Sequence, residues 1–182
     1  MIGLLTRLHH SIFGAFESIS TPVLTTLARF VFAAVLFVYF LNSALTKTPD
    51  GFSNLFSPSF NAFAQIFPKG AEAVSYDITA ASSFQKLVIL AGTWAEFILP
   101  ALIVIGLFTR LAALGMIGFV AVQSLTDIFG HGATPGAWFD GASDALILDQ
   151  RAFWVFLLLY LALKGGGPLS VDRILAGRRE EY

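Results

Sequence analysis

The sequence has no cysteine among its 182 residues, and acidic and basic residues make up only 13% of it. Without cysteine there can be no disulfide bond, cysteine-ligated iron–sulfur cluster, thiol nucleophile or CxxC redox pair. An average soluble domain is about 25% charged, so half of the usual solvating charge is missing. The 11 basic residues face 12 acidic ones and form no basic stripe, which argues against a nucleic-acid partner.

Apolar residues are correspondingly abundant. They make up 56% of the chain, 19 of them are phenylalanines, and the mean hydropathy is +0.75. One soluble core of this size cannot enclose so many large side chains, and the apolar content excludes intrinsic disorder. The sequence therefore predicts an all-α fold, with one integral membrane domain over residues 1–182.

Four segments are long and apolar enough to cross a bilayer as helices, which takes about 20 residues each. They are expected at residues 23–45, 87–108, 111–129 and 145–164, and together they form a four-helix bundle. Thr21-Pro22 suits the start of the first helix, and the tight turn Thr109-Arg110 makes the second and third helices an antiparallel hairpin. The fourth helix accepts Asp149 and Arg151 near one surface and ends at glycines 165–167.

Two further segments are expected to form short helices at the membrane surface. Residues 1–20 carry apolar side chains at helical spacing between charged ones, which is typical of an interfacial amphipathic helix and not of a cleavable signal peptide. The loop after the first span repeats phenylalanine at positions 52, 56, 60, 63 and 67, and Pro58 and Pro68 bracket a short helix there. That helix either packs on the bundle or covers a lipophilic ligand.

The distribution of lysine and arginine predicts the orientation. The N-terminus, the turn at Arg110 and the C-terminal tail carry most of the basic residues, whereas the other loops are acidic. Both termini are therefore expected in the cytoplasm, in a multi-pass protein of a bacterial-type inner (plasma) membrane.

Ionisable residues at membrane depth are costly and raise a functional question. At 1.5 Å per residue, Arg29 of the first span lies about 10 Å and Glu96 of the second about 18 Å below the same surface, and a long arginine side chain lets them meet. We expect either a buried ion pair that sets the helix register or a role for Glu96 as proton acceptor or ligand-binding group. With Trp94 and Gln123, these residues are the candidate ligand-binding set.

A second polar cluster is expected at the outer end of the bundle. Gln123, Asp127 and His131 are spaced four apart and share one helical face, and Asn42 and Lys47 end the first span at the same level. Asp127 and His131 are only two possible ligands, whereas a usual metal site has three or four. We therefore expect these residues to act as hydrogen-bonded caps and loop anchors and to bind no metal. No histidine pair lies within a span, which argues against haem.

Several stretches resemble the DoxX family of small four-helix membrane proteins. The likeness covers nearly the whole chain and lies in Leu27–Phe30, Leu45–Lys47, Ala95–Phe97, Gly106–Ala113 and Gly166–Asp172. Its most distinctive part is Glu96 followed by the Gly106–Ala113 stretch, which resembles the family's Gly-Leu-x-Thr-Arg turn. The resemblance implies a link to quinone-coupled redox chemistry, as in membrane subunits of thiosulfate:quinone oxidoreductase, or a role as membrane anchor for sulfur-handling or superoxide-removing enzymes.

Three functions are therefore considered. The first is a membrane subunit of a quinone-linked oxidoreductase, with the quinone held near Trp94 and Glu96 and with Arg29 or Gln123 as donor. No residue of the chain stores electrons, so another subunit or cofactor must supply them and the isolated chain is not expected to be catalytic. The second is a non-enzymatic scaffold for soluble redox or sulfur-handling enzymes. The third is a small-solute carrier, which with four spans and no internal repeat would need a homo-oligomer.

Overall fold

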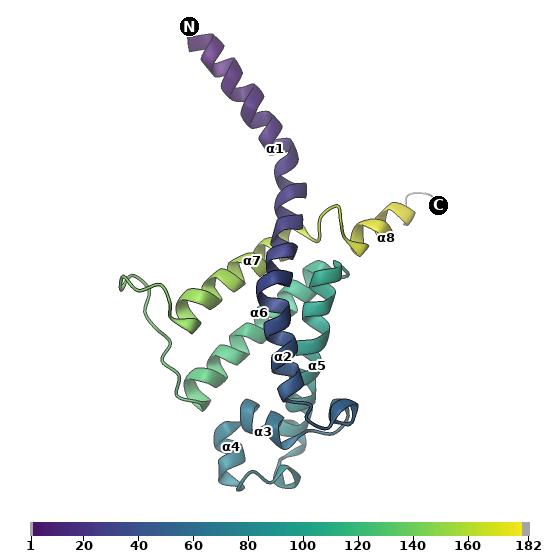
Figure 1. The fold of residues 1–182 in the computed structure, drawn as a ribbon, viewed down its shortest axis with the longest axis vertical. Coiled ribbons are helices and arrows are strands. Elements are labelled where there is room, and N and C mark those ends of the chain that lie inside the picture. Colours follow the sequence, from purple (N-terminus) through teal and green to yellow (C-terminus); the bar gives the residue numbers. More distant parts are fainter. Residues whose placement is uncertain (1, 180–182) are drawn as a thin grey trace.

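The computed structural model describes residues 2–179, without the side chains of residues 2–5, 8, 11, 12, 178 and 179. All regular elements in this part of the chain are helical (Figure 1). Four continuous helical segments are long and apolar enough to cross a membrane: Phe13–Thr46, Ser83–Ile105, Thr109–Gly130 and Leu146–Lys164. The all-helical prediction and the four expected segments are confirmed at this level.

The first long segment consists of α1 (Ile2–Phe32), the π-helical turn η1 (Ala33–Phe37) and α2 (Val38–Thr46). Its predicted start at Thr21-Pro22 is wrong, because α1 continues through Pro22 without a break. A proline inside a helix removes one backbone hydrogen bond, and the helix persists on both sides of it. The N-terminal amphipathic segment is therefore helical but not separate, and it extends away from the bundle (Figure 1).

A small helical cap follows α2 at the lower end of the bundle (Figure 1). It comprises η2 (Gly51–Leu55), α3 (Phe60–Ile66), α4 (Pro68–Ala73) and η3 (Ile78–Ala80). The predicted short helix between Pro58 and Pro68 is confirmed as α3, and the Ser59 side chain caps its first turn. Phe63 and Ile89 share a buried cluster, so α3 packs on the start of the second span.

The second and third spans form a hairpin of α5 (Ser83–Ile105) and α6 (Thr109–Leu125). A capping box of Ser82 and Gln85 begins α5, as this sequence pattern favours. Gly106 ends it with a φ of 72°, in the left-handed region that glycine enters without strain. The turn is therefore 106–108, and Thr109 and Arg110 belong to the first turn of α6 instead of forming the loop.

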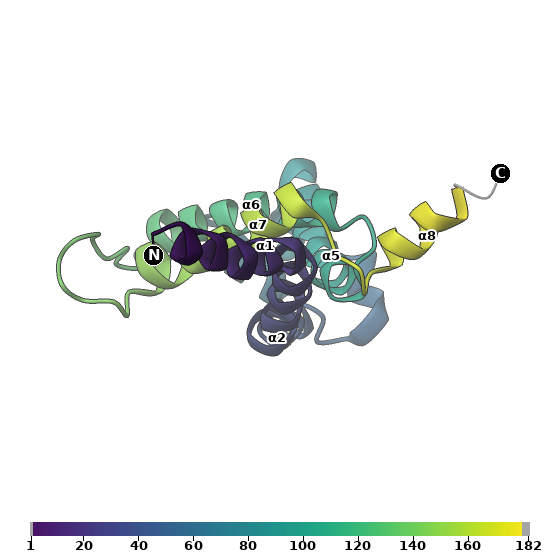
Figure 2. The same ribbon diagram turned by 90° about the horizontal axis from the view of Figure 1, so that it is seen from above.

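The fourth span begins with the π-helical turn η5 (Leu146–Gln150) and continues as α7 (Arg151–Lys164). It includes Asp149 and Arg151 and ends at Gly165, as predicted. Before it, η4 (Thr126–Gly130) extends α6 and a loop covers residues 131–145. After it, α8 (Val171–Arg179) leads away from the bundle, opposite the 131–145 loop (Figures 1 and 2).

The core lies where the four long segments meet. Its fully enclosed side chains include Phe32 and Phe40 of the first segment, Met116 of α6 and Leu158 of α7. The outward faces are apolar as well, with Phe153 for example 72% exposed. Helices that are apolar on all sides are typical of a protein surrounded by lipid.

Candidate functional site

A groove of about 490 Å³ lies between α5 and α6, and residues of α3 and of the end of α2 also line it. Small residues create this hollow, because they leave the space between the two helices unfilled. Ala91, Gly92 and Ala95 contribute from α5, and Gly115 and Gly118 contribute from α6. A Cβ added to Gly118 would meet no heavy atom within 4 Å. The remaining walls are mainly apolar and include Leu99, Phe119 and Val122.

One wall of the groove carries a buried ion pair between Lys47 and Glu96. The Lys47 Nζ lies 2.8 Å from Oε2 and 3.0 Å from Oε1 of Glu96. Ser43 completes the arrangement, because its hydroxyl donates to Glu96 Oε1 at 2.9 Å and its carbonyl lies 3.3 Å from the lysine nitrogen. Lys47 is 6% and Glu96 3% exposed. A charged pair is thus held beside an apolar hollow.

The opposite wall carries the polar face of α6 and η4. Gln123 donates from Nε2 to the Tyr39 hydroxyl at 3.0 Å, while its buried Oε1 has no hydrogen-bond partner among the described residues. His131 Nε2 lies 2.9 Å from the carbonyl oxygen of Gln65, on α3. A buried oxygen without a partner costs free energy, so Gln123 offers the groove a free acceptor.

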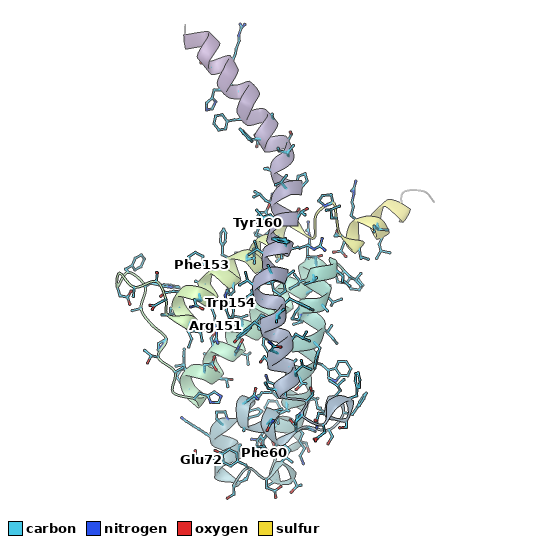
Figure 3. All side chains as sticks on the ribbon, viewed as in Figure 1. Phe60, Glu72, Arg151, Phe153, Trp154 and Tyr160 are labelled. Carbon is cyan, nitrogen blue, oxygen red and sulfur yellow. The ribbon has the colours of Figure 1, made fainter. Side chains whose placement is uncertain are left out.

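Asp127 connects the groove to a second ion pair, in which the arginine is buried and the aspartate is half-buried. Its carboxylate accepts from Arg151 Nη2 at 2.5 Å, and Arg151 Nη1 donates to the Ser124 hydroxyl at 2.9 Å. Arg151 is only 3% exposed, and its guanidinium carbon lies 5.9 Å from the centre of the Trp154 ring. Figure 3 shows Arg151 and Trp154 on the first turns of α7.

The sequence interpretation missed this role of Arg151, which it placed near the surface at the start of the fourth span. The available signal was a single arginine beginning that span, at the same outer level as Asp127 on the third. Opposite charges at one depth on neighbouring helices predict a pair, because each unpaired charge would be costly there.

The predicted meeting of Arg29 and Glu96 is wrong. The Arg29 guanidinium instead donates to backbone carbonyls at the other end of the bundle: those of Ile103, Val104, Gly166 and Leu169. The carbonyls of Val104, Gly166 and Leu169 lie where the helical hydrogen-bond pattern has ended, whereas that of Ile103 also accepts from the Gly106 backbone N–H at 3.2 Å. One planar guanidinium reaches all four. Arg29 therefore joins α1, α5 and the segment before α8, and the interior site expected around it does not form.

Glu96 finds its partner in Lys47 because of the direction that the lysine takes. Lys47 follows the last residue of α2, yet its side chain turns back along that helix to the level of Ser43. The expected depths placed Lys47 outside and Arg29 inside. They did not include the reach of a lysine side chain that folds back toward the middle of the bundle.

The other predicted residues lie outside the groove. Trp94 Nε1 donates to the Leu55 carbonyl at 2.9 Å, and its ring packs edge-on against Phe56. Asn42 is exposed on α2. The groove thus brings together five of the eight predicted site residues: Lys47, Glu96, Gln123, Asp127 and His131. Within residues 2–179, no three His, Asp or Glu side chains are grouped so that they could hold a metal ion.

No protein-family model, no curated protein and no solved structure matches this chain. The resemblance to the DoxX family therefore rests on the sequence stretches described above.

Proposed function

We propose that this chain is a DoxX-like membrane subunit of a quinone-linked oxidoreductase complex, and that the groove between α5 and α6 binds the quinone. The single observation that carries the proposal is an apolar groove with hydrogen-bonding groups on both walls. Sites for small organic ligands combine largely apolar walls with a few placed polar groups.

The position of the groove favours a ligand that dissolves in lipid. Ala91, Gly118 and Val122 line it and are exposed on the outer faces of their helices. In a bilayer these faces meet acyl chains, so a lipophilic molecule reaches the groove from the side without crossing water. A polar solute would have to leave water to enter, which disfavours the carrier alternative.

The polar groups suit a ring that carries two oxygens. Ser43 and Lys47 are donors, whereas Glu96 and the unpartnered Oε1 of Gln123 are acceptors. Carbonyl oxygens require donors and hydroxyl groups also require acceptors, so the groove contains partners for both the oxidised and the reduced form. A bound quinone would supply the redox chemistry. Glu96 can receive a proton beside it, with Lys47 stabilising the carboxylate before transfer.

The test is the quinone content of the purified full-length protein, measured after solvent extraction. Gly118→Phe fills the groove from a position where an added Cβ meets no heavy atom within 4 Å, and we expect quinone recovery to fall at least tenfold. Gly118→Ala keeps the groove open and should retain the ligand. Ala121→Phe places the same ring on the same helix at an exposed position outside the groove and should retain it as well.

A second arm tests the polar wall. Glu96→Gln keeps the shape of the side chain and removes its charge, so we expect weaker quinone retention with the helix content unchanged by circular dichroism. Equal quinone content in Gly118→Phe and in wild type would overturn the groove as the binding site. No quinone in wild type, combined with capture of a soluble redox enzyme that survives both substitutions, would favour the scaffold function instead.

The proposal includes a plasma-membrane location with both termini cytoplasmic. The N- and C-terminal helices leave the bundle at the same end as the α5–α6 turn (Figure 1). That end carries Arg110, Lys164 and Arg173, as the positive-inside rule requires of a cytoplasmic side. Because the chain has no cysteine, single cysteines can be introduced at two exposed positions, Ile174 on α8 and Ser53 in the helical cap, and labelled with a membrane-impermeant reagent from outside intact cells. Labelling of the first from outside would refute this orientation.

A further inference from the structure

A second hollow, of about 620 Å³, lies at the opposite end of the bundle from the Lys47–Glu96 pair. Four segments surround it: α1 at residues 21–25, the first turn of α6, the end of α7 with the loop 165–168, and the start of α8. Three cationic side chains line it, those of Arg110, Lys164 and Arg173. Residues far apart in the sequence thus bring positive charge to one place.

These three cations are not neutralised by the protein. Within residues 2–179 their side chains form no hydrogen bond and no ion pair. The one carboxylate in the lining, that of Asp172, accepts from the backbone N–H groups of Phe108 at 2.7 Å and Thr109 at 2.9 Å. The helix N-terminus is therefore already capped, and the excess positive charge remains available to an anion.

The Thr109 hydroxyl is a second, independent sign of a ligand. The residue lines the hollow and is fully buried, yet its Oγ1 has no hydrogen-bond partner among the described residues. Buried hydroxyl groups in folded proteins are almost always hydrogen-bonded, so this one calls for an acceptor. An anionic oxygen near three cations would supply it.

An apolar hollow of about 420 Å³ adjoins the cationic one and shares Pro22 and Pro168 with it. It follows the lipid-facing side of α1, along Val23, Leu27 and Phe30. A polar site next to an apolar channel matches a molecule with an anionic head and a hydrocarbon tail. A free anion would use only the first hollow.

We propose that the two hollows bind one anionic phospholipid, with its phosphoryl group among Arg110, Lys164 and Arg173 and beside the Thr109 hydroxyl. Basic pockets at the cytoplasmic level of membrane helices suit phosphoryl headgroups. The acyl chain then lies against α1. This site is independent of the quinone groove, which lies at the other end of the molecule.

The test is native mass spectrometry of the full-length protein in a neutral detergent, titrated with dioleoyl-phosphatidylglycerol or dioleoyl-phosphatidylcholine. We expect the anionic lipid to bind at least tenfold more tightly, since each basic residue near an anionic headgroup contributes favourably. The triple variant Arg110→Gln/Lys164→Gln/Arg173→Gln should lose this preference. Thr109→Val should weaken binding several-fold without lowering the lipid-free melting temperature, because its hydroxyl has no protein partner to lose.

The matched control is Arg7→Gln/Lys69→Gln/Lys86→Gln, which removes the same charge elsewhere and should keep the preference. An equal loss in this control, or no preference in wild type, would overturn the site. Inorganic phosphate that competes at equal concentration would show that a free anion, not a lipid, is the ligand. Should the triple variant fail to fold, Arg110→Gln alone and Thr109→Val carry the same comparison.

Discussion

The buried pair of Lys47 and Glu96 leads to a strong prediction. Removing either partner leaves the other as a buried charge without its counter-charge, which destabilises the fold. Replacing Glu96 by Gln keeps the shape of the side chain and leaves the lysine ammonium without its counter-charge. Lys47 then retains Ser43, whose hydroxyl and carbonyl oxygens lie 3.0 and 3.3 Å from its Nζ. Replacing Lys47 by Met leaves Glu96 with the Ser43 hydroxyl alone.

The structure sets the expected magnitude. Two unit charges separated by the observed 2.8 Å attract each other by about 6 kcal/mol at an effective dielectric constant of about 20. Part of this attraction offsets the loss of hydration, and breaking a buried pair from one side usually costs about 3–5 kcal/mol. Because Ser43 still accepts hydrogen bonds from the lysine, we expect Glu96→Gln to lower the free energy of unfolding by about 3 kcal/mol, near the lower end of this range. We expect Lys47→Met to lower it by the same amount or more.

The double variant separates the pair from its surroundings. Removing both charges leaves no buried ion, so Lys47→Met/Glu96→Gln should be more stable than the sum of the single effects predicts, by about 2–3 kcal/mol. The assay is reversible unfolding in mixed detergent micelles, followed by tryptophan fluorescence and far-ultraviolet circular dichroism. Lys69→Met, at an exposed lysine, is the control and should change stability by less than about 0.5 kcal/mol. If each single substitution lowered the free energy of unfolding by less than about 1 kcal/mol, and if the two effects were additive in the double variant, the ion pair would be refuted.

Other predictions follow from the ends of the bundle. Arg29→Lys should destabilise the protein by about 2–4 kcal/mol, since hydrogen bonds to charged groups contribute about 1.5–3 kcal/mol each. The lysine ammonium lacks the planar guanidinium that reaches four carbonyls. An unchanged melting temperature would contradict this prediction. Gly106→Ala should cost about 1–3 kcal/mol, because φ is 72° and the added Cβ would lie 2.6 Å from a side-chain carbon. Gly118→Ala, in an open helical position, should be neutral or slightly stabilising in the same melts. Hydrogen bonds from the Thr79 hydroxyl and backbone N–H lower the pKa of Asp77 below its ordinary value. This contribution to stability is present above the ordinary pKa and is lost as the pH falls through the lowered one. Thr79→Ala should move the titration midpoint of Asp77, followed by carbonyl NMR, to higher pH. An unchanged midpoint would show that the Thr79 hydroxyl does not lower the Asp77 pKa.

The element pattern was readable from local properties of the sequence. A helix that crosses a bilayer needs length and apolar composition, and both are visible in one window of residues. The glycines at 106 and 165 mark helix ends for an equally local reason, since each adopts a positive φ there. The start of the first span was not readable at Pro22, because a proline is compatible with either the first turn or the interior of a long helix.

The choice of partner for each charged residue between the long helices depended on tertiary structure. Depth along separate helices placed Arg29 and Glu96 within reach of each other, but it contains no information on helix rotation or on the path of each side chain. The carbonyls at the end of α5 and in the glycine-rich loop accept hydrogen bonds from Arg29, and Lys47 turns inward to meet Glu96. Both outcomes depend on groups that are adjacent only after the bundle has assembled.

The sequence by itself thus determined that the chain forms four long apolar helices with a few costly polar residues, because hydropathy and helix geometry act over neighbouring residues. Only the tertiary structure decided which of those residues share a groove. The groove forms where small residues of two helices, Gly92 and Ala95 of α5 and Gly118 of α6, line the same space. The pairing of Arg151 with Asp127 requires the fourth helix to lie against the third. These are contacts between distant segments, which no local pattern specifies.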